Sequence, residues 1–117
     1  MTSTRLNRHI RWCVASLSLV LCSMGPSAAA GARKPATHSV TIDASRYEPE
    51  QLTVQAGDTV VWVNKDLVAH TATSQMGDFD SGLIAPGKSW KYRSKRVGEF
   101  AYTCTYHPTM KATLRVK

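Results

Sequence analysis

Short runs of alternating apolar and polar residues dominate this chain beyond its N-terminal segment. Alternation with a period of two is typical of a strand that buries one of its faces. The run Thr59–Asn64 differs, because apolar residues occupy both parities, and it predicts a strand covered on both faces. The alternating runs, each of which predicts one strand, are Val40–Asp43, Leu52–Ala56, Trp90–Arg93, Phe100–Cys104 and Ala112–Lys117.

Turn-forming residues separate these runs. Ala56–Asp58 contains a glycine and predicts a hairpin between Leu52–Ala56 and Thr59–Asn64. Pro49 indicates a loop or a sheet edge, and Gln75–Pro86 is expected to be irregular with one short strand at most. Strands recur about every 8 to 12 residues without any helical period, so the chain predicts an all-β fold, an antiparallel β-sandwich of a single domain.

Residues 1–30 have the three-part order of a secretory signal peptide. A basic segment precedes an apolar segment at residues 12–21, and small residues follow at 27–30. The apolar segment is shorter than the roughly 20 residues that span a bilayer, so we expect cleavage and no stable membrane insertion. This predicts a periplasmic protein with a linker at residues 31–37 and one folded domain at residues 38–117.

The net charge narrows the possible partners only slightly. The formal charge is +7, and Arg5, Arg8 and Arg11 of the signal segment supply three of these charges. The remaining excess is too small to indicate nucleic-acid binding, and we expect a monomer. A basic cluster from Lys88 to Arg96 fits either an exposed strand face or a partner-docking surface.

The cysteine count is more informative. Cys13 and Cys22 lie in the predicted signal peptide, so the exported domain would keep only Cys104 and could form no internal disulfide. A lone thiol in an oxidising compartment is a liability unless it is buried or bound to a metal. Both explanations are open for Cys104 taken alone.

The residues after Cys104 favour metal binding. The spacing Cys104-x-x-His107-x-x-Met110 places a thiolate, an imidazole and a thioether in one short loop. Beyond the signal segment the other histidines are His38 and His70. His70 follows an apolar strand, and a β-sandwich can bring the loop after that strand to the same end of the fold as the Cys104 loop. Two imidazoles, one thiolate and an axial thioether form the ligand set of a type 1 (blue) copper site. We therefore expect one copper ion at these residues, and a solvated His38.

Other interpretations compete with this one. One cysteine and two histidines could hold zinc with a water, although a thioether suits copper better. Met110 alone could be core filling. Catalysis is disfavoured because no triad or carboxylate pair is present and four protein ligands leave no open position, so we expect no enzyme. A copper delivery or storage protein and a metal-free interaction module remain alternatives.

The motifs along the chain resemble those of the plastocyanin/azurin cupredoxins, and the short ligand loop is most similar to that of amicyanin. The resemblance implies an eight-stranded Greek-key β-sandwich with copper at one end, which carries single electrons between periplasmic redox proteins. The residues that carry the resemblance are Tyr47, Pro49, Leu52, Val54, Gly57, Asp58, Val60, Trp62, Asn64, His70, Phe79–Gly82, Pro86–Ser89, Tyr102, Cys104, His107, Pro108 and Met110.

Two positions depart from the pattern of that family. Tyr106 stands where the amicyanin loop has proline, and it retains a backbone N–H able to reach the Cys104 sulfur. Such a donor would favour Cu(I) and raise the reduction potential. Thr71 stands where the family has asparagine, and its hydroxyl is expected to tie the two ligand loops together.

Apolar residues are expected to surround the ligands. Leu67, Val68, Tyr106 and Pro108 could simply keep water from the metal. The resemblance also implies that they form a weak docking patch around the exposed edge of His107, and contacts of transient redox partners are small.

Overall fold

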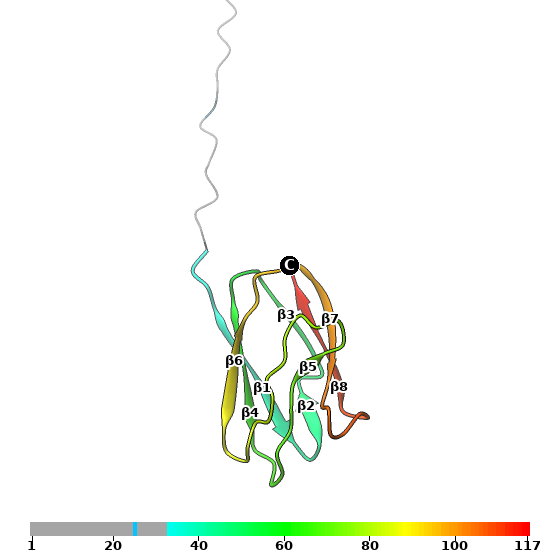
Figure 1. Ribbon diagram of the computed structural model, residues 1–117. Helices are drawn as coiled ribbons and strands as arrows, with labels where there is room; N and C mark the ends of the chain where they lie inside the picture. The colour runs from blue at the N-terminus through cyan, green and yellow to red at the C-terminus, as the bar shows by residue number, and fades with distance from the viewer. Residues whose placement is uncertain (1–24, 26–32) are drawn as a thin grey trace, which may run out of the picture. The chain divides into compact units, whose positions relative to one another are not determined.

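The computed structural model describes residue 25 and residues 33–117 (Figure 1). The predicted signal peptide, apart from Gly25, lies outside the described residues, so its removal stays a prediction. No described residue belongs to a helix that could cross a bilayer. The strands are β1 (Thr37–Asp43), β2 (Arg46–Glu48), β3 (Gln51–Val54), β4 (Thr59–Asn64), β5 (Thr73–Ser74), β6 (Ser89–Arg93), β7 (Gly98–Thr103) and β8 (Lys111–Val116).

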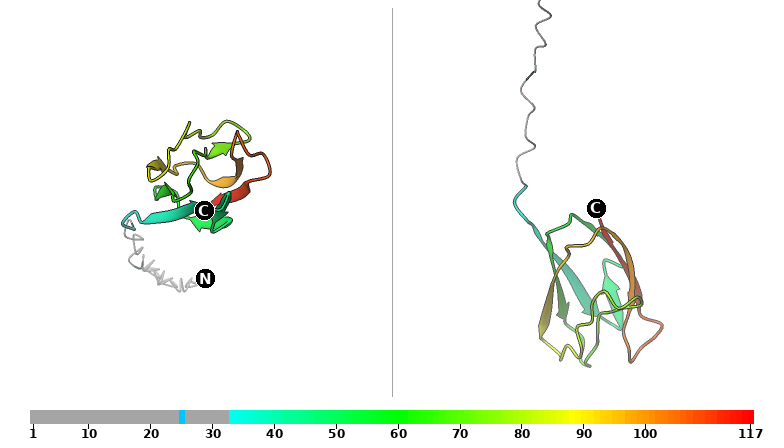
Figure 2. Two further views of the ribbon diagram at one scale, coloured as in Figure 1. Left: turned by 90° about the horizontal axis from the view of Figure 1, so that it is seen from below. Right: turned by 45° about the horizontal axis from the view of Figure 1, so that its top comes forward.

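These strands form two four-stranded sheets that face each other as layers (Figure 2). One sheet has the order β2-β1-β4-β6 and the other β3-β8-β7-β5. The all-β sandwich is therefore confirmed. The expected antiparallel pairing is wrong in two places, because β1 runs parallel to β4 and β3 runs parallel to β8. In both cases the paired strands are not consecutive in sequence, so no turn between them dictates their direction.

The predicted hairpin between Leu52–Ala56 and Thr59–Asn64 is also wrong. The turn exists, with Gly57 at a φ of 96°, but β3 and β4 belong to different sheets. The Gly57 N–H donates to the Ser94 carbonyl, and the Ser94 N–H donates to the Asp58 carbonyl at 2.9 Å. The turn is thus bonded to the β6–β7 connection and carries the chain from one sheet to the other.

The core lies between the two sheets and contains most of the predicted inward-facing residues. Trp62 is fully buried, and its ring meets that of Tyr102 edge-on at 5.6 Å between centroids. Burying a large apolar side chain contributes about 1.5–3 kcal/mol. Along β4 only alternate residues are buried, and Val61 and Val63 are half-buried. The expectation that β4 is covered on both faces is therefore wrong, because a two-layer sandwich leaves one face of each sheet toward solvent.

The start of the domain is held by Asp58, whose side chain is 1% exposed. Strand β1 begins at Thr37, one position before the predicted boundary. The Asp58 carboxylate accepts hydrogen bonds from the Ala36 N–H at 2.9 Å and from the Arg33 guanidinium, both in the expected linker. His38 Nε2 lies 2.8 Å from the same carboxylate. The expectation of a solvated His38 is wrong, because its imidazole contacts Asp58. The two residues lie 20 positions apart, so the local sequence did not indicate this contact.

Candidate metal centre

The four candidate ligands lie in two loops at one end of the domain, the lower end in Figure 1. His70 follows the loop after β4 and forms an isolated bridge with Ile84, with backbone hydrogen bonds of 3.2 and 2.7 Å. Cys104 follows β7 directly, and His107 and Met110 lie in the connection to β8. Antiparallel pairing of β7 and β8 returns this connection to the same end of the sheet.

Backbone hydrogen bonds close the connection into a compact loop. The His107 N–H donates to the Cys104 carbonyl at 3.3 Å, and the Met110 N–H donates to the His107 carbonyl at 2.8 Å. The Cys104 N–H in turn donates to the Met110 carbonyl at 3.3 Å. The two ends of the loop are therefore bonded to each other, and the i, i+3 spacing of the motif matches the successive turns.

Three donor atoms come together as the sequence predicts. Cys104 Sγ lies 3.8 Å from His70 Nδ1 and 3.6 Å from His107 Nδ1. The donor atoms of the three residues all fall within 4.8 Å of one another. Metal bonds of about 2.3 Å to sulfur and 2.1 Å to nitrogen, set about 120° apart, require a sulfur–nitrogen separation of about 3.8 Å. These residues thus fit a metal ion in a trigonal plane.

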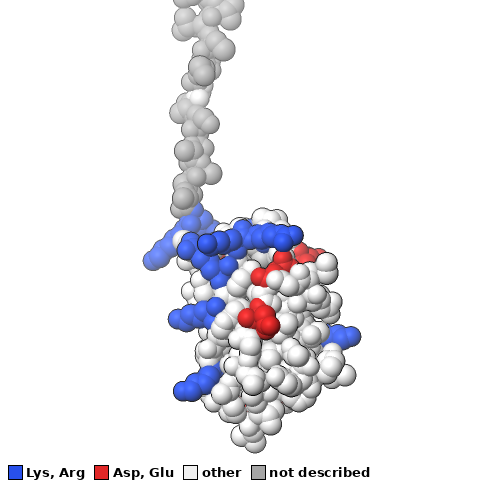
Figure 3. Space-filling view, in the orientation of Figure 1, with Lys and Arg blue, Asp and Glu red and all other residues white. Residues whose placement is uncertain are grey.

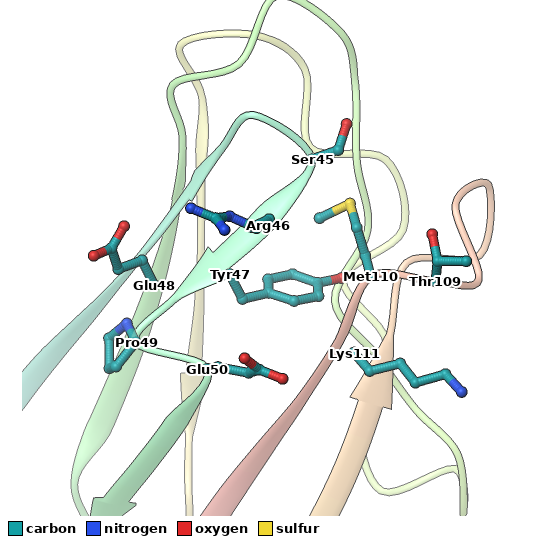
Figure 4. Close-up of a pocket in the computed structure, with 9 residues that line it drawn as sticks. All are labelled: Ser45, Arg46, Tyr47, Glu48, Pro49, Glu50, Thr109, Met110 and Lys111. Carbon is teal, nitrogen blue, oxygen red and sulfur yellow. The ribbon is translucent and has the colours of Figure 1, made fainter.

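Met110 is buried beside this cluster, with 3% of its surface exposed. Its side chain lies next to the end of the Tyr47 ring along one wall of a hollow of about 380 Å³ (Figure 4). Of the four candidate ligands only Met110 lines this hollow, which residues 45–50 and 109–111 enclose. Met110 therefore lies in the core at the end of the ligand loop, and its thioether is a ligand type that suits copper.

The environment of Cys104 favours its thiolate form. The side chain is completely buried, and burial raises the pKa of the thiol. The Thr71 N–H, which donates to the sulfur at 3.3 Å, the imidazoles of His107 and His70 and the Tyr106 N–H outweigh this effect and lower the pKa to about 6. A thiolate at neutral pH is the form that binds a metal. The expected effect of the Tyr106 N–H on the reduction potential stays a prediction.

The hydroxyl of Thr71 ties the two ligand loops together, as expected. Its Oγ1 accepts a hydrogen bond from the Thr105 N–H at 2.9 Å and lies 3.2 Å from the Thr105 hydroxyl. The Tyr47 hydroxyl donates to the Thr71 carbonyl in the buried core. Thr71 therefore connects the His70 loop, the Cys104 loop and strand β2 through hydrogen bonds.

Asn64 and Asp66 hold the His70 loop in place, although the sequence pattern predicted no role for either. The buried Asn64 amide donates to the carbonyls of Val68 and Ile84, both at 2.8 Å, and so shapes the loop before His70. Asp66 Oδ2 lies 2.8 Å from His70 Nε2. The Ser45 N–H foremost, and then His70 and the Leu67 N–H, lower the pKa of Asp66 to about 2. The only sequence feature that could have indicated this contact is the position of Asp66, four residues before His70.

Exposed apolar residues of the segments that carry the ligands form an apolar rim: Leu67, Val68, Leu83 and Tyr106. Leu67 is 92% exposed and Tyr106 61% exposed, whereas His107 is half-buried between the loops. Leu83, which the sequence analysis did not include, is also exposed beside Ile84, the backbone partner of His70. In Figure 3 no Lys, Arg, Asp or Glu side chain is visible at the lower tip of the domain.

The predicted basic cluster begins beside the His70 loop, where the Lys88 carbonyl accepts the Asn64 N–H at 2.9 Å, and follows β6 toward the opposite end of the domain. Exposed cations follow β6 and its flanking connections, with Lys91 and Arg93 on the solvent face of the strand. Trp90 and Tyr92 occupy the other face and are half-buried against the core, as the alternation in Trp90–Arg93 predicts. Arg96 pairs with Asp78 at 2.9 Å. An exposed edge strand accounts for these charges, because cations on an edge oppose strand pairing with other molecules.

Comparison with known proteins gives consistent matches. A family model described as a cupredoxin-like domain matches residues 13–116. Amicyanin from Paracoccus versutus is 27% identical over 83 residues, which cover 67% of this chain and 63% of that protein. Plastocyanin from Scenedesmus fuscus is 31% identical over 84 residues, 61% of this chain and 86% of that protein. The solved structure of a purple cupredoxin from Nitrosopumilus maritimus has a TM-score of 0.63 at 26% identity and covers 68% of this chain and 99% of that one. The matched region thus spans less than two thirds of the length of the Paracoccus amicyanin.

Proposed function

Because this chain belongs to the cupredoxin-like domain family, we propose that it is a type 1 copper protein that carries single electrons between redox proteins of the periplasm. One observation supports this most directly: the buried Cys104 sulfur lies 3.8 and 3.6 Å from the Nδ1 atoms of His70 and His107. His70 and His107 would hold one copper ion through their Nδ1 atoms and Cys104 through its thiolate, and Met110 would add its thioether sulfur.

The copper ion, when bound, supplies the one-electron Cu(II)/Cu(I) couple. The residues of the chain supply rigidity and access. His70 and Cys104 are fully buried and bonded to neighbouring carboxylate or backbone groups, so a reorientation of either side chain would break these bonds. His107 is the partly exposed imidazole of the cluster and follows the exposed Tyr106, so it is the route by which an electron would enter or leave.

The same arrangement argues against an enzyme. Four protein ligands would leave no open position for a substrate at the metal. The rim of Leu67, Val68, Leu83 and Tyr106 offers a small uncharged surface, which suits a brief encounter with a redox partner. The periplasmic location rests on the predicted signal peptide.

Adding Cu(II) to the purified protein tests the proposal. We expect the intense blue absorption of a short copper–thiolate bond. Cys104→Ser is expected to fold and to stay colourless, because a serine hydroxyl cannot replace the thiolate. Met110→Leu, which keeps the planar ligands, is expected to remain coloured. A colourless wild-type protein would contradict the proposal and favour copper delivery, copper storage or a metal-free interaction module.

A further inference from the structure

The outer nitrogen of His70 is held by a carboxylate. His70 is fully buried and directs Nδ1 toward the Cys104 sulfur, at 3.8 Å. Its other nitrogen, Nε2, lies 2.8 Å from Asp66 Oδ2. An imidazole that binds a metal through Nδ1 carries its proton on Nε2, so His70 donates this hydrogen bond to Asp66. Within residues 33–117, no other carboxylate forms a hydrogen bond or ion pair with a candidate ligand.

The Asp66 carboxylate is itself fixed from three directions. Its Oδ2 also accepts the Ser45 N–H at 2.9 Å, and its Oδ1 accepts the Leu67 N–H at 2.8 Å. The Asp66 N–H donates to the Asn64 side-chain oxygen at 2.9 Å. With its side chain 17% exposed, Asp66 cannot swing into solvent without breaking these bonds.

The Ser45 donor comes from a turn with an unfavourable backbone. Ala44 and Ser45 form the two-residue connection between the paired residues Asp43 and Arg46, and their φ values are 47° and 55°. Side chains of L-residues disfavour this left-handed region, and such turns usually contain asparagine or glycine. Here the conformation aims the Ser45 N–H at a carboxylate 21 positions away in the chain. Backbone strain of this kind is often retained where it serves a functional site.

We propose that Asp66 is a positioning residue of the metal centre: held by the Ser45 turn, it fixes the tautomer and orientation of His70 and makes the imidazole a stronger donor. A more basic imidazole binds Cu(II) better than Cu(I), so Asp66 lowers the reduction potential. This inference rests on the proposed function, since it concerns the same copper site. The chain would then contain a carboxylate–histidine–metal arrangement that joins the turn between β1 and β2 to the loop that carries His70.

The test compares Asp66→Asn with Glu50→Gln. Asp66→Asn keeps the size of the side chain and removes its charge. Glu50→Gln also removes one negative charge, from a residue that lines the hollow beside Met110 and whose carboxylate makes no hydrogen bond within residues 33–117. Voltammetry of the copper-loaded proteins gives the potential, and competition titration gives the Cu(II) affinity.

For Asp66→Asn we expect roughly tenfold weaker binding of Cu(II) relative to Cu(I), in line with losses of such outer partners. Tenfold corresponds to a rise of about 59 mV for a one-electron couple. Glu50→Gln should change the ratio about twofold or less, because its charge is screened by solvent. Equal shifts in the two variants, or no shift in Asp66→Asn, would overturn the inference.

A measurement on the wild-type protein covers the case in which Asp66→Asn does not fold. Proton NMR of the Cu(I)-loaded protein should show a downfield, slowly exchanging His70 Nε2 proton, and its absence would also overturn the inference. A wild-type protein that takes up no copper would instead contradict the proposed function. In that case the same His70 proton in the metal-free protein still tests the contact with Asp66.

Discussion

The hydroxyl of Thr71 allows a quantitative test of how the two ligand loops are joined. Thr71→Val keeps the shape of a side chain that is 3% exposed but removes the oxygen that accepts the Thr105 N–H at 2.9 Å. The hydroxyls of Thr73 and Thr105 lie 3.2 Å apart and can bond to each other in the variant. One backbone N–H therefore loses its partner, at a cost of about 1–3 kcal/mol. Thr105 is itself exposed, so we expect the lower part of that range.

Urea unfolding of the metal-free protein measures this loss. With a slope of about 1–2 kcal/mol per molar urea, a loss of about 1 kcal/mol should lower the midpoint of Thr71→Val by about 0.5–1 M. Thr71→Ser is the matched control, because it keeps the hydroxyl and loses only a methyl group worth about 0.8 kcal/mol. Amide hydrogen exchange separates the two effects: the Thr105 amide should stay protected in Thr71→Ser and become unprotected in Thr71→Val. A protected Thr105 amide together with an unchanged midpoint in Thr71→Val would refute the reasoning.

Three further predictions concern the sulfur, the rim and the opposite end of the domain. Tyr106→Pro removes an N–H that lowers the pKa of Cys104, so voltammetry should give a lower reduction potential than in the wild type. Tyr106→Ala keeps the N–H and is the control. An unchanged or raised potential in Tyr106→Pro would count against this prediction. Leu67→Glu places a charge on a 92% exposed rim residue. If two molecules meet through this rim, their new charges about 4 Å apart repel by about 1 kcal/mol in water, so the electron self-exchange rate measured by NMR should fall roughly fivefold at an unchanged potential. An unaltered rate would argue against docking there. The Ala36 N–H foremost, against an opposing effect of burial, and then His38 and Arg33 lower the pKa of Asp58 far below its usual range. Its stabilising effect is therefore complete above the unfolded pKa of about 3.9 and is lost as pH falls below that value; Tm should decline more steeply below about pH 4 in the wild type than in Asp58→Asn, and parallel declines would contradict this.

The ligand loop could be predicted because its geometry is local. Cys104, His107 and Met110 lie within one connection, and the inward parity of Phe100 and Tyr102 on β7 extends to Cys104. His70 required one nonlocal step, that a strand of the sandwich returns its loop to the same end. The structure brings His70, Cys104 and His107 together, and the role of all four residues as copper ligands stays a proposal.

The supporting residues could not be predicted in the same way. Asp66 gains its role from a contact with Ser45, and Thr71 from contacts with Tyr47 and Thr105, all of which join separate segments of the chain. Nothing in the pattern around each residue states which distant backbone group will face it. Asp58 likewise ties the start of the domain to the turn between β3 and β4, and this contact depends on the pairing of β1 with β4.

The sequence by itself determined which residues face inward, where the chain turns and which donor types lie within reach of one another in the ligand loop. These properties depend on alternation and spacing along a single strand or loop, which follow from backbone geometry. The tertiary structure alone decided that β3 pairs with β8 and β4 with β1 and β6, so that the turn at Gly57 crosses between sheets. Strand alternation is the same for any partner, and the choice among partners depends on packing the whole core at once.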